Sequence, residues 1–443
     1  MEENSHSTGR PLSQVERIIW RLSEAAPMNV TMVARVRGPL SETRLSASLR
    51  VLQQQYELLQ VRVERDGDFL GFRSDQVPEI PLRSISAESD SWVGLAEREI
   101  NDPISSQRGP LARCVHVRHA EDEHHLLLTF HHVVGDGMSG VYLVRDLLDA
   151  VAQRDTKATN HAIPKGIPVA MDQRLPAYTR GSRGWGSGLR FQAASSWSDF
   201  RFGKPQRTRL DVSQPPYERR IRILPREYAA SLSQQLLERA RQENTTVHAA
   251  LAAAMCLSVA EDLSKDHPVS MKFRTPVNVR GVLTPPVGED LGLFASMVFF
   301  RQRVASTDEY WPLARKIRTQ IKGQVDRGVP CMLVRLMPVL YRLMRADQLS
   351  DAEFSHRWYE ATPSTCGITN IGRLDVPTEY GDLQLQALHF AVALSSLGDF
   401  SCTVSSLAGR LHCNFLCPEP VLSDSHAEAL VERIESRLLR AIA

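Results

Sequence analysis

The spacing of apolar residues in the first part of the chain predicts a helix followed by several strands. Residues 41–59 repeat leucine at the spacing of an amphipathic helix, and residues 59–64 then alternate strictly between apolar and polar side chains. A strand predicted over 112–120 turns through three acidic residues into a second strand, 124–132. This second strand is apolar on both faces, so we expect it to lie in the middle of its sheet.

A segment rich in proline, glycine and serine, residues 164–202, separates this part from a second run of predicted elements. We therefore expect an N-terminal subdomain over 1–165, a crossover over 166–205 and a C-terminal subdomain over 206–443. The C-terminal part is predicted to begin with a strand at 219–225 and two helices, one from Pro225 to about Gln242 and one over 244–263 capped by Asn244 or Thr245. Strands at 269–280 and 293–304 and an apolar helix over 331–345, interrupted at Pro338, are predicted to follow. The end of the chain is predicted to form strands at 383–394 and 401–417, the second with a turn at Ala408-Gly409, and a closing helix over 423–442 with Ser423 as its cap. Hairpins mixed with helices indicate an α/β chain of the α+β sandwich type.

The composition of the 443 residues is that of an ordinary globular chain, with 42% apolar and 23% charged residues. A net charge of +2 gives no bulk basic field, so we expect no nucleic-acid partner. Residues 1–20 lack a secretory signal, and the apolar run 249–260 is shorter than the ~20 residues that cross a bilayer. Seven scattered cysteines without a C-x-x-C pair indicate reduced thiols and no metal site, as in a cytoplasmic protein without a transmembrane segment.

The glycine-rich stretch after the central strand admits a nucleotide-binding interpretation. Gly135, Gly137 and Gly140 spell G-x-G-x-x-G between a predicted strand and a predicted helix over 138–153. A dinucleotide-binding turn needs a further strand after that helix, ending in an acidic residue that holds the ribose. Here the helix runs instead into the proline- and glycine-rich segment, so this interpretation fails.

Two histidines in the same stretch suggest acid–base chemistry instead. If the strand continues to its end, His131 and His132 point to opposite faces, so that one can support the structure while the other enters a cleft. A neutral imidazole is well suited to take a proton near pH 7. Asp136 should be ionised and needs a partner if it is buried. On these residues alone, an ordinary glycine turn after two histidines remains the simpler alternative.

The whole heptapeptide His131–Gly137 resembles the H-H-x-x-x-D-G motif of a superfamily of acyl-transferring enzymes. The superfamily includes chloramphenicol acetyltransferase, nonribosomal-peptide condensation domains, plant BAHD acyltransferases and mycobacterial phthiocerol dimycocerosyl transferases. Further segments that resemble it are 58–64, 108–117, 275–280 (TPVNVR), 292–300 (GLFASMVFF) and 368–375 (ITNIGRLD), so the similarity extends over about 10–440. It is greatest for the stand-alone dimycocerosyl transferase and alcohol acetyltransferase branch. The D-F-G-W-G motif of the plant branch is absent.

This resemblance implies two chloramphenicol-acetyltransferase-like subdomains in a V-shaped pseudo-dimer with a central tunnel. His132 would be the general base, and His131 would be structural. Asp136 would pair with Arg280, while Gly137 would keep the channel open and its N–H would help to hold the oxyanion. Thr369 and Asn370 would line the tunnel, although an ordinary strand-end turn is an equal alternative for these two.

The resemblance also implies a reaction and a set of partners. An acyl group would pass directly from acyl-CoA or an acyl carrier protein to a hydroxyl or amine of a small-molecule acceptor. The reaction would need no acyl-enzyme, metal or bound cofactor. Because no carrier domain is apparent, we expect a stand-alone, monomeric enzyme that works beside a polyketide or peptide synthase.

Two other functions compete with this one. A free-standing condensation enzyme would form an amide from aminoacyl carriers. A non-catalytic module would only dock a carrier protein, although such modules usually lose part of the motif, which is intact here. Arginines on the predicted helix 331–345 could dock an acidic carrier. A packed helix with solvated arginines is the simpler interpretation of that segment.

Overall fold

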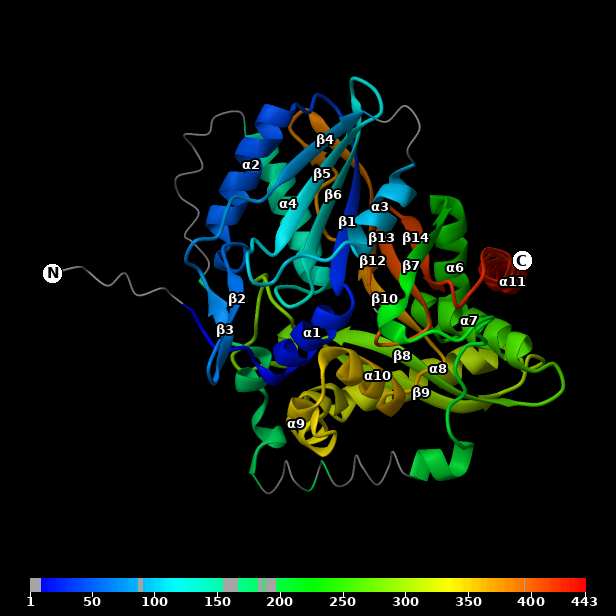
Figure 1. Ribbon diagram of the computed structural model, residues 1–443. Coiled ribbons are helices and arrows are strands. Elements are labelled where there is room, and N and C mark those ends of the chain that lie inside the picture. The colour runs from blue at the N-terminus through cyan, green and yellow to red at the C-terminus, as the bar shows by residue number, and fades with distance from the viewer. Residues whose placement is uncertain are drawn as a thin grey trace.

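The computed structural model describes residues 9–86, 91–153, 166–181, 186, 188, 197–393 and 395–443. These residues form two six-stranded sheets and one two-stranded hairpin, with helices around them (Figure 1). The α/β class predicted from the sequence is therefore confirmed. The predicted end of the N-terminal subdomain, 154–165, and part of the predicted crossover, 182–185, 187 and 189–196, lie outside the described residues.

The first sheet has the strand order β11-β12-β1-β6-β5-β4 and is built mainly from the N-terminal part. Its strands are β1 Asn29–Arg37, β4 Leu82–Ser86, β5 Ala112–Arg118, β6 Glu123–His131, β11 Glu379–Tyr380 and β12 Leu383–Val392, beside the hairpin β2 Arg62–Asp66 and β3 Phe69–Arg73. Helices α2 (Glu42–Gln55) and α4 (Gly137–Ala152) cover one face, and α3 (Trp92–Asn101) packs on the other.

Strand β6 is central, as the sequence predicted, and pairs antiparallel with β1 and β5. Leu126 and Leu128 pack in the cluster that contains α2 and α4, whereas Leu127 packs with α3 on the opposite face. The sequence analysis missed β1, which lies between β6 and β12. Its first six residues are all buried, so the strand lacks the apolar–polar alternation that would have revealed it.

The second sheet has the order β7-β14-β13-β10-β8-β9. Its strands are β7 Arg220–Tyr228, β8 Val269–Asn278, β9 Ala295–Val304, β10 Cys366–Arg373, β13 Phe400–Leu407 and β14 Arg410–Glu419. Helices α6 (Ala230–Gln242), α7 (Val247–Leu263), α8 (Tyr310–Asp326) and α11 (Asp424–Ile442) pack in one apolar cluster with this sheet. Helices α1 (Gln14–Ala25), α9 (Val329–Leu343) and α10 (Asp351–Ala361) lie toward the other face of β8 and β9 (Figure 1).

The C-terminal part of the chain also enters the first sheet. β12 pairs antiparallel with β1 and carries β11 at its outer edge, before the chain returns to the second sheet through β13. The two halves are therefore joined by shared strands as well as by the crossover. The sequence did not predict that β12 joins the first sheet, because the alternation of apolar and polar residues in a strand is the same whichever sheet the strand joins.

Three local predictions need correction. Pro225 does not begin a helix: β7 continues to Tyr228, and a proline is tolerated there because β7 is an edge strand. Helix α7 is capped by Thr246, whose hydroxyl accepts from the N–H of Ala249, and not by Asn244 or Thr245. Pro338 lies inside α9 without ending it.

Helix α7 is buried on all sides over residues 249–260. In the part of the chain that the structure describes, no single helix is long and apolar enough to cross a membrane. Helices α6 and α7 reach that length and composition only as a pair, with a 93° bend between them.

Candidate active site

The histidine motif lies at the junction between β6 and α4. Strand β6 ends at His131, and α4 begins at Gly137 with Asp136 as its N-cap. The Asp136 carboxylate accepts from the backbone N–H of Ser139, as an N-cap residue does. His132 therefore lies in the turn and not in the strand, and its position depends on the tight connection from strand to helix.

The glycines of this turn allow close packing. A Cβ at Gly140 would lie 2.5 Å from Sδ of Met32 on β1, and a Cβ at Gly135 would lie 2.9 Å from the ring of Phe130. A Cβ at Gly137 would lie 2.9 Å from Cγ2 of Ile371 in the second sheet. The first turn of α4 thus approaches both sheets more closely than side chains would allow, so a phosphate cradle is not needed to explain these glycines.

His132 is held in one orientation by a backbone hydrogen bond. Its Nδ1 lies 2.7 Å from the carbonyl oxygen of Gly135, so Nδ1 must carry the proton and donate it. Nε2 then has a free lone pair, and no hydrogen-bond partner for it occurs among the described residues. Burial lowers the pKa of His132 below the ordinary histidine value, although the Gly135 carbonyl and the charge of Asp136 partly oppose this. The imidazole is therefore neutral at pH 7.

His131 faces the protein interior, as the sequence analysis predicted for a structural residue. Only 2% of its side chain is exposed, and its Nδ1 accepts a hydrogen bond from the N–H of Val133 at 3.0 Å. Burial, followed by the neighbouring charge of His132, lowers the pKa of His131 to about 3. His131 is thus a neutral group that fixes the turn in which His132 lies.

The predicted ion pair between Asp136 and Arg280 is present. Nη1 of Arg280 lies 2.8 Å from Oδ2 of Asp136, and each side chain is 4% exposed. Asp136 also accepts from the N–H and hydroxyl of Ser139 and from the N–H of Phe294. Burial alone would raise the pKa of Asp136, but the charge and hydrogen bond of Arg280 lower it below the usual value. The pair fastens α4 of the first half to the β8–β9 region of the second.

His132 opens on a cavity of about 1040 Å³ that residues from both halves line. Gly137 and Thr369 also line it, whereas Asn370 does not. The Asn370 side chain instead accepts from the N–H of Gly372 at 2.7 Å and holds a local turn. The walls are mainly apolar, with Ile18, Ile19, Leu293, Met297, Phe299, Met332, Leu333, Met337, Leu340 and Trp358 among the lining residues. Such a cavity suits a largely apolar substrate.

The sequence analysis missed four basic residues that line the same cavity, Lys272, Arg274, Arg301 and Arg327. Lys272 and Arg274 project from one face of β8, and Arg301 projects from the neighbouring β9. The signal for the first two was available. Residues 269–280 were predicted as a strand, and two bases at alternate positions share one face of it.

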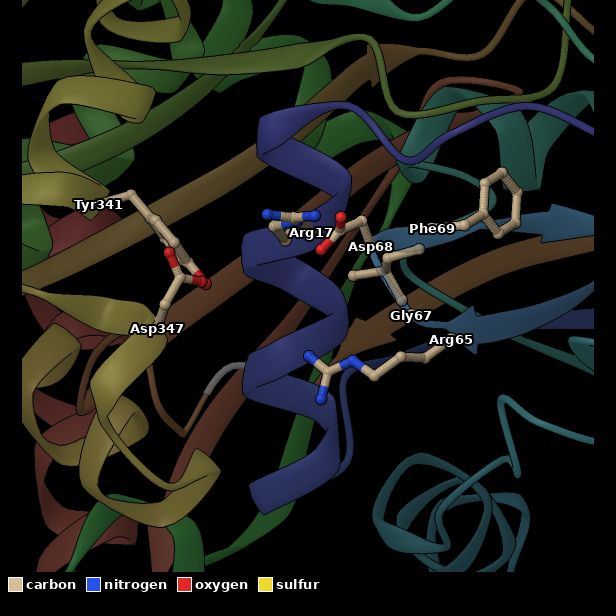
Figure 2. Close-up of a pocket in the computed structure, with 8 residues that line it drawn as sticks. Arg17, Arg65, Gly67, Asp68, Phe69, Tyr341 and Asp347 are labelled. Atoms are coloured by element: carbon tan, nitrogen blue, oxygen red, sulfur yellow. The ribbon is translucent and has the colours of Figure 1, made fainter.

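A second cavity, of about 460 Å³, lies between α1, the β2–β3 turn and the end of α9 (Figure 2). It brings Arg17 and Arg65 together with Asp68 and Asp347, and no histidine lines it. Its mixed charges and the lack of a histidine among its lining residues make it a poor candidate for acid–base chemistry.

One group of possible metal ligands occurs among the described residues. Ligand atoms of Glu227, His389 and His412 lie within 4.8 Å of one another. The imidazole of His389 already contacts Glu227 and Asn414, and the guanidinium of Arg35 lies 3.6 Å from the Glu227 carboxylate. Because this carboxylate already has cationic and hydrogen-bonding partners, the group does not require a metal ion. The expectation that the reaction needs no metal stays a prediction.

Comparison with protein families adds an independent line of argument. The condensation-domain model matches residues 11–165, which include His132. The model for the C-terminus of phthiocerol/phthiodiolone dimycocerosyl transferase matches residues 227–416, which include Arg280. Both matches fit the superfamily of chloramphenicol acetyltransferase and condensation domains. This similarity indicates a transferase.

Two curated relatives are a synthase and a synthase subunit. The isonitrile lipopeptide synthase of Mycobacterium tuberculosis is 25% identical over 356 residues, which are 74% of this chain and 14% of the relative. A component of the linear gramicidin synthase from Brevibacillus parabrevis is 25% identical over 349 residues, 72% of this chain and 6% of the relative. This chain thus spans only a small part of the length of these relatives.

Two solved structures share the whole architecture. Trichothecene 15-O-acetyltransferase from Fusarium sporotrichioides superposes with a TM-score of 0.76 at 13% identity, covering 100% of this chain and 96% of that one. Polyketide synthase associated protein 5 from Mycobacterium tuberculosis gives a TM-score of 0.70 at 16% identity, covering 98% of both chains. At these identities the likeness concerns the fold. It confirms the predicted pseudo-dimer of two related subdomains.

Proposed function

We propose that this protein transfers an acyl group from a phosphopantetheine thioester to a hydroxyl or amine of a small molecule. The orientation of His132 is the observation that carries the proposal. Its Nδ1 is occupied by the Gly135 carbonyl, so its unprotonated Nε2 is available in a largely apolar cavity that both halves line. A neutral, oriented imidazole in such a site is suited to act as a general base.

The reaction then proceeds in one direct transfer. Nε2 of His132 takes the proton of the acceptor as the acceptor oxygen or nitrogen attacks the thioester carbonyl. The backbone N–H of Gly137, the first residue of α4, has no partner within the helix and can donate to the developing oxyanion. Collapse of the tetrahedral intermediate forms the ester or amide, and the departing thiolate takes the proton back from His132.

The donor is either acyl-CoA or an acyl carrier protein. The relatives include synthases for polyketides and peptides, which supports a synthase or its carrier as the partner. The protein itself would hold no cofactor, because the phosphopantetheine arm arrives and leaves with each turnover. A free-standing enzyme that forms amides is the alternative within the same fold, and a carrier-docking module is the non-catalytic alternative.

The test is mass spectrometry of the products after incubation with a panel of acyl-CoA and acyl-carrier donors and paired alcohol and amine acceptors. We expect His132→Ala to lower kcat by about 10²- to 10⁴-fold, the range for loss of a general base, with an unchanged circular dichroism spectrum. His119→Ala is the matched control, since His119 is an exposed histidine of the same half. Turnover that persists in His132→Ala would refute the proposed mechanism.

The choice of acceptor separates the two enzymatic alternatives. Products from alcohols alone would identify an ester-forming enzyme, and products from amines alone would identify the amide-forming one. A folded protein that binds acyl carriers but forms no product with any pair would support the docking module.

A further inference from the structure

One end of the active-site cavity is basic. Lys272 and Arg274 lie on β8 and Arg301 lies on β9, all three on the sheet face that lines the cavity. We call these three residues the cationic end of the cavity. Toward the other end of β8, the cavity wall becomes apolar through Pro276, Ala295 and Met297.

The cationic end carries positive charge that the protein does not neutralise. Arg301 is paired with Asp199 at 2.7 Å, but neither Lys272 nor Arg274 has a carboxylate within 4.0 Å in the described part of the chain. Burial lowers the pKa of Lys272 to about 8 and that of Arg274 to about 10. Both side chains are half-buried at the wall of the cavity. A partly desolvated cation without a counter-ion is unfavourable, so two of them on one face of a strand require an explanation.

The surroundings hold both groups in place. Nζ of Lys272 lies over the ring of Phe299 at 4.5 Å from its centre. The Arg274 guanidinium donates to the carbonyl of Leu397 and lies against Gly398, where a Cβ would be only 2.6 Å from Nη2. Gly398 therefore leaves the space that the guanidinium occupies. The other nearby carboxylate, Asp399, is already taken by Arg219 at 2.7 Å and by Tyr359.

The cationic end lies at a distance from the chemistry. Lys272 and Asn278 are six residues apart on β8, which corresponds to about 20 Å along an extended strand. Arg280, just beyond the strand, contacts Asp136 in the loop that carries His132. A substrate that reaches both places is therefore elongated, with an apolar middle part between its reacting group and its far end.

On these grounds we infer that the cavity binds an amphipathic substrate whose far end is an anion, a carboxylate or a phosphate, held by Lys272 and Arg274. The inference rests on the proposed function, since it names the substrate class of the same cavity. The anion would supply the charge that the protein lacks at this place, and the apolar wall would bind the chain. The selectivity determinant would then lie on the second half of the molecule, away from His132.

Binding measurements test the inference separately from catalysis. The probes are dodecanoate, dodecyl phosphate and the neutral methyl dodecanoate, titrated below their micelle concentrations by calorimetry. We expect one or both anions to bind about 10- to 100-fold more tightly than the ester, the range for a charge-assisted hydrogen bond. A preference for dodecanoate identifies a carboxylate as the natural group, and a preference for dodecyl phosphate identifies a phosphate.

Lys272→Met is the decisive variant, since methionine is an unbranched side chain of similar bulk that lacks the charged Nζ lying over Phe299. We expect it to remove the preference for the anions and to leave the affinity for the ester unchanged. Lys322→Met is the matched control, because Lys322 is 64% exposed on α8 and pairs with Asp326 outside the cavity. His132→Ala should bind all three probes as the wild type does.

Two results would overturn the inference. Equal binding of the anions and the ester to the wild type would show that the cationic end selects nothing. An anion preference that survives in Lys272→Met, or is lost equally in Lys322→Met, would place the recognition elsewhere. Failure of acyl transfer would refute the proposed function but leave the binding result intact, because no probe contains a thioester.

Discussion

Replacing Asp136 by asparagine should separate the role of its charge from its role as a helix cap. Asparagine can still accept from Ser139, but it leaves the Arg280 guanidinium buried and unpaired, with only 4% of that side chain exposed. Removing one member of a buried ion pair costs about 3–5 kcal/mol. We expect Asp136→Asn to lower the free energy of unfolding by this amount.

The double variant Asp136→Asn/Arg280→Met gives the interaction energy. Because the methionine removes the stranded charge, the double variant should be less destabilised than Asp136→Asn alone. The measurement is urea unfolding followed by tryptophan fluorescence, restricted to the first cooperative transition, since a chain with two sheets need not unfold in one step. The exposed pair Arg37–Asp122, with side chains 59% and 51% exposed, is the control and should contribute at most ~1 kcal/mol.

The pH dependence provides a second readout of the same pair. The pKa of Asp136 is lowered in the folded state, so its stabilisation is present above the ordinary aspartate pKa and is lost as the pH falls through the lowered value. Wild type and Asp136→Asn should therefore converge in stability toward acid pH. If Asp136→Asn costs no more than the surface pair at pH 7, the ion pair does not fasten the two halves and the reasoning is wrong.

Three further predictions concern the motif and its surroundings. Since burial lowers the pKa of His132, the acid limb of the kcat/KM–pH profile should have its midpoint below the ordinary histidine value of about 6.5. A midpoint at or above that value would contradict a neutral, buried base. Gly140→Ala should lower the free energy of unfolding by about 1–3 kcal/mol in urea titrations, because its Cβ would overlap Met32, and Met32→Ala should relieve part of this cost. Thr246→Ala should cost about 1 kcal/mol in the same assay through loss of the α7 cap, while a change of less than a few tenths would mean that another group caps the helix.

The parts of the site that could be predicted from sequence are those that local chemistry determines. The motif His131–Gly137 is contiguous, so its strand, turn and helix follow from neighbouring residues, and the resemblance to a known family assigned Arg280 as the distant partner. The placement of β12 in the first sheet could not be predicted, because sheet membership depends on tertiary packing. Asn370 shows the same limit, since its neighbour Thr369 lines the cavity while its own side chain closes a turn.

Helix α9 illustrates how packing decides between two interpretations of one pattern. Arg335, Arg342 and Arg345 are exposed. A helix that docks a carrier protein and an ordinary packed helix would both expose these side chains. The apolar face of α9, including Met332 and Met337, lines the active-site cavity, which explains the helix without a carrier protein. Docking of a carrier on its outer face stays a prediction.

The structure divides the proposed work between the two halves of the chain. The first half supplies the base, because β6 and α4 orient His132, and the second half supplies Lys272 and Arg274 at the far end of the same cavity. Asp136 and Arg280 join the halves beside the base, so a change in that contact should affect turnover. Changes at Lys272 and Arg274 lie at the end of the cavity away from that contact and should alter which substrate binds without altering the base. A chain built in this way can change its substrate by substitutions on one sheet while the chemistry on the other is preserved.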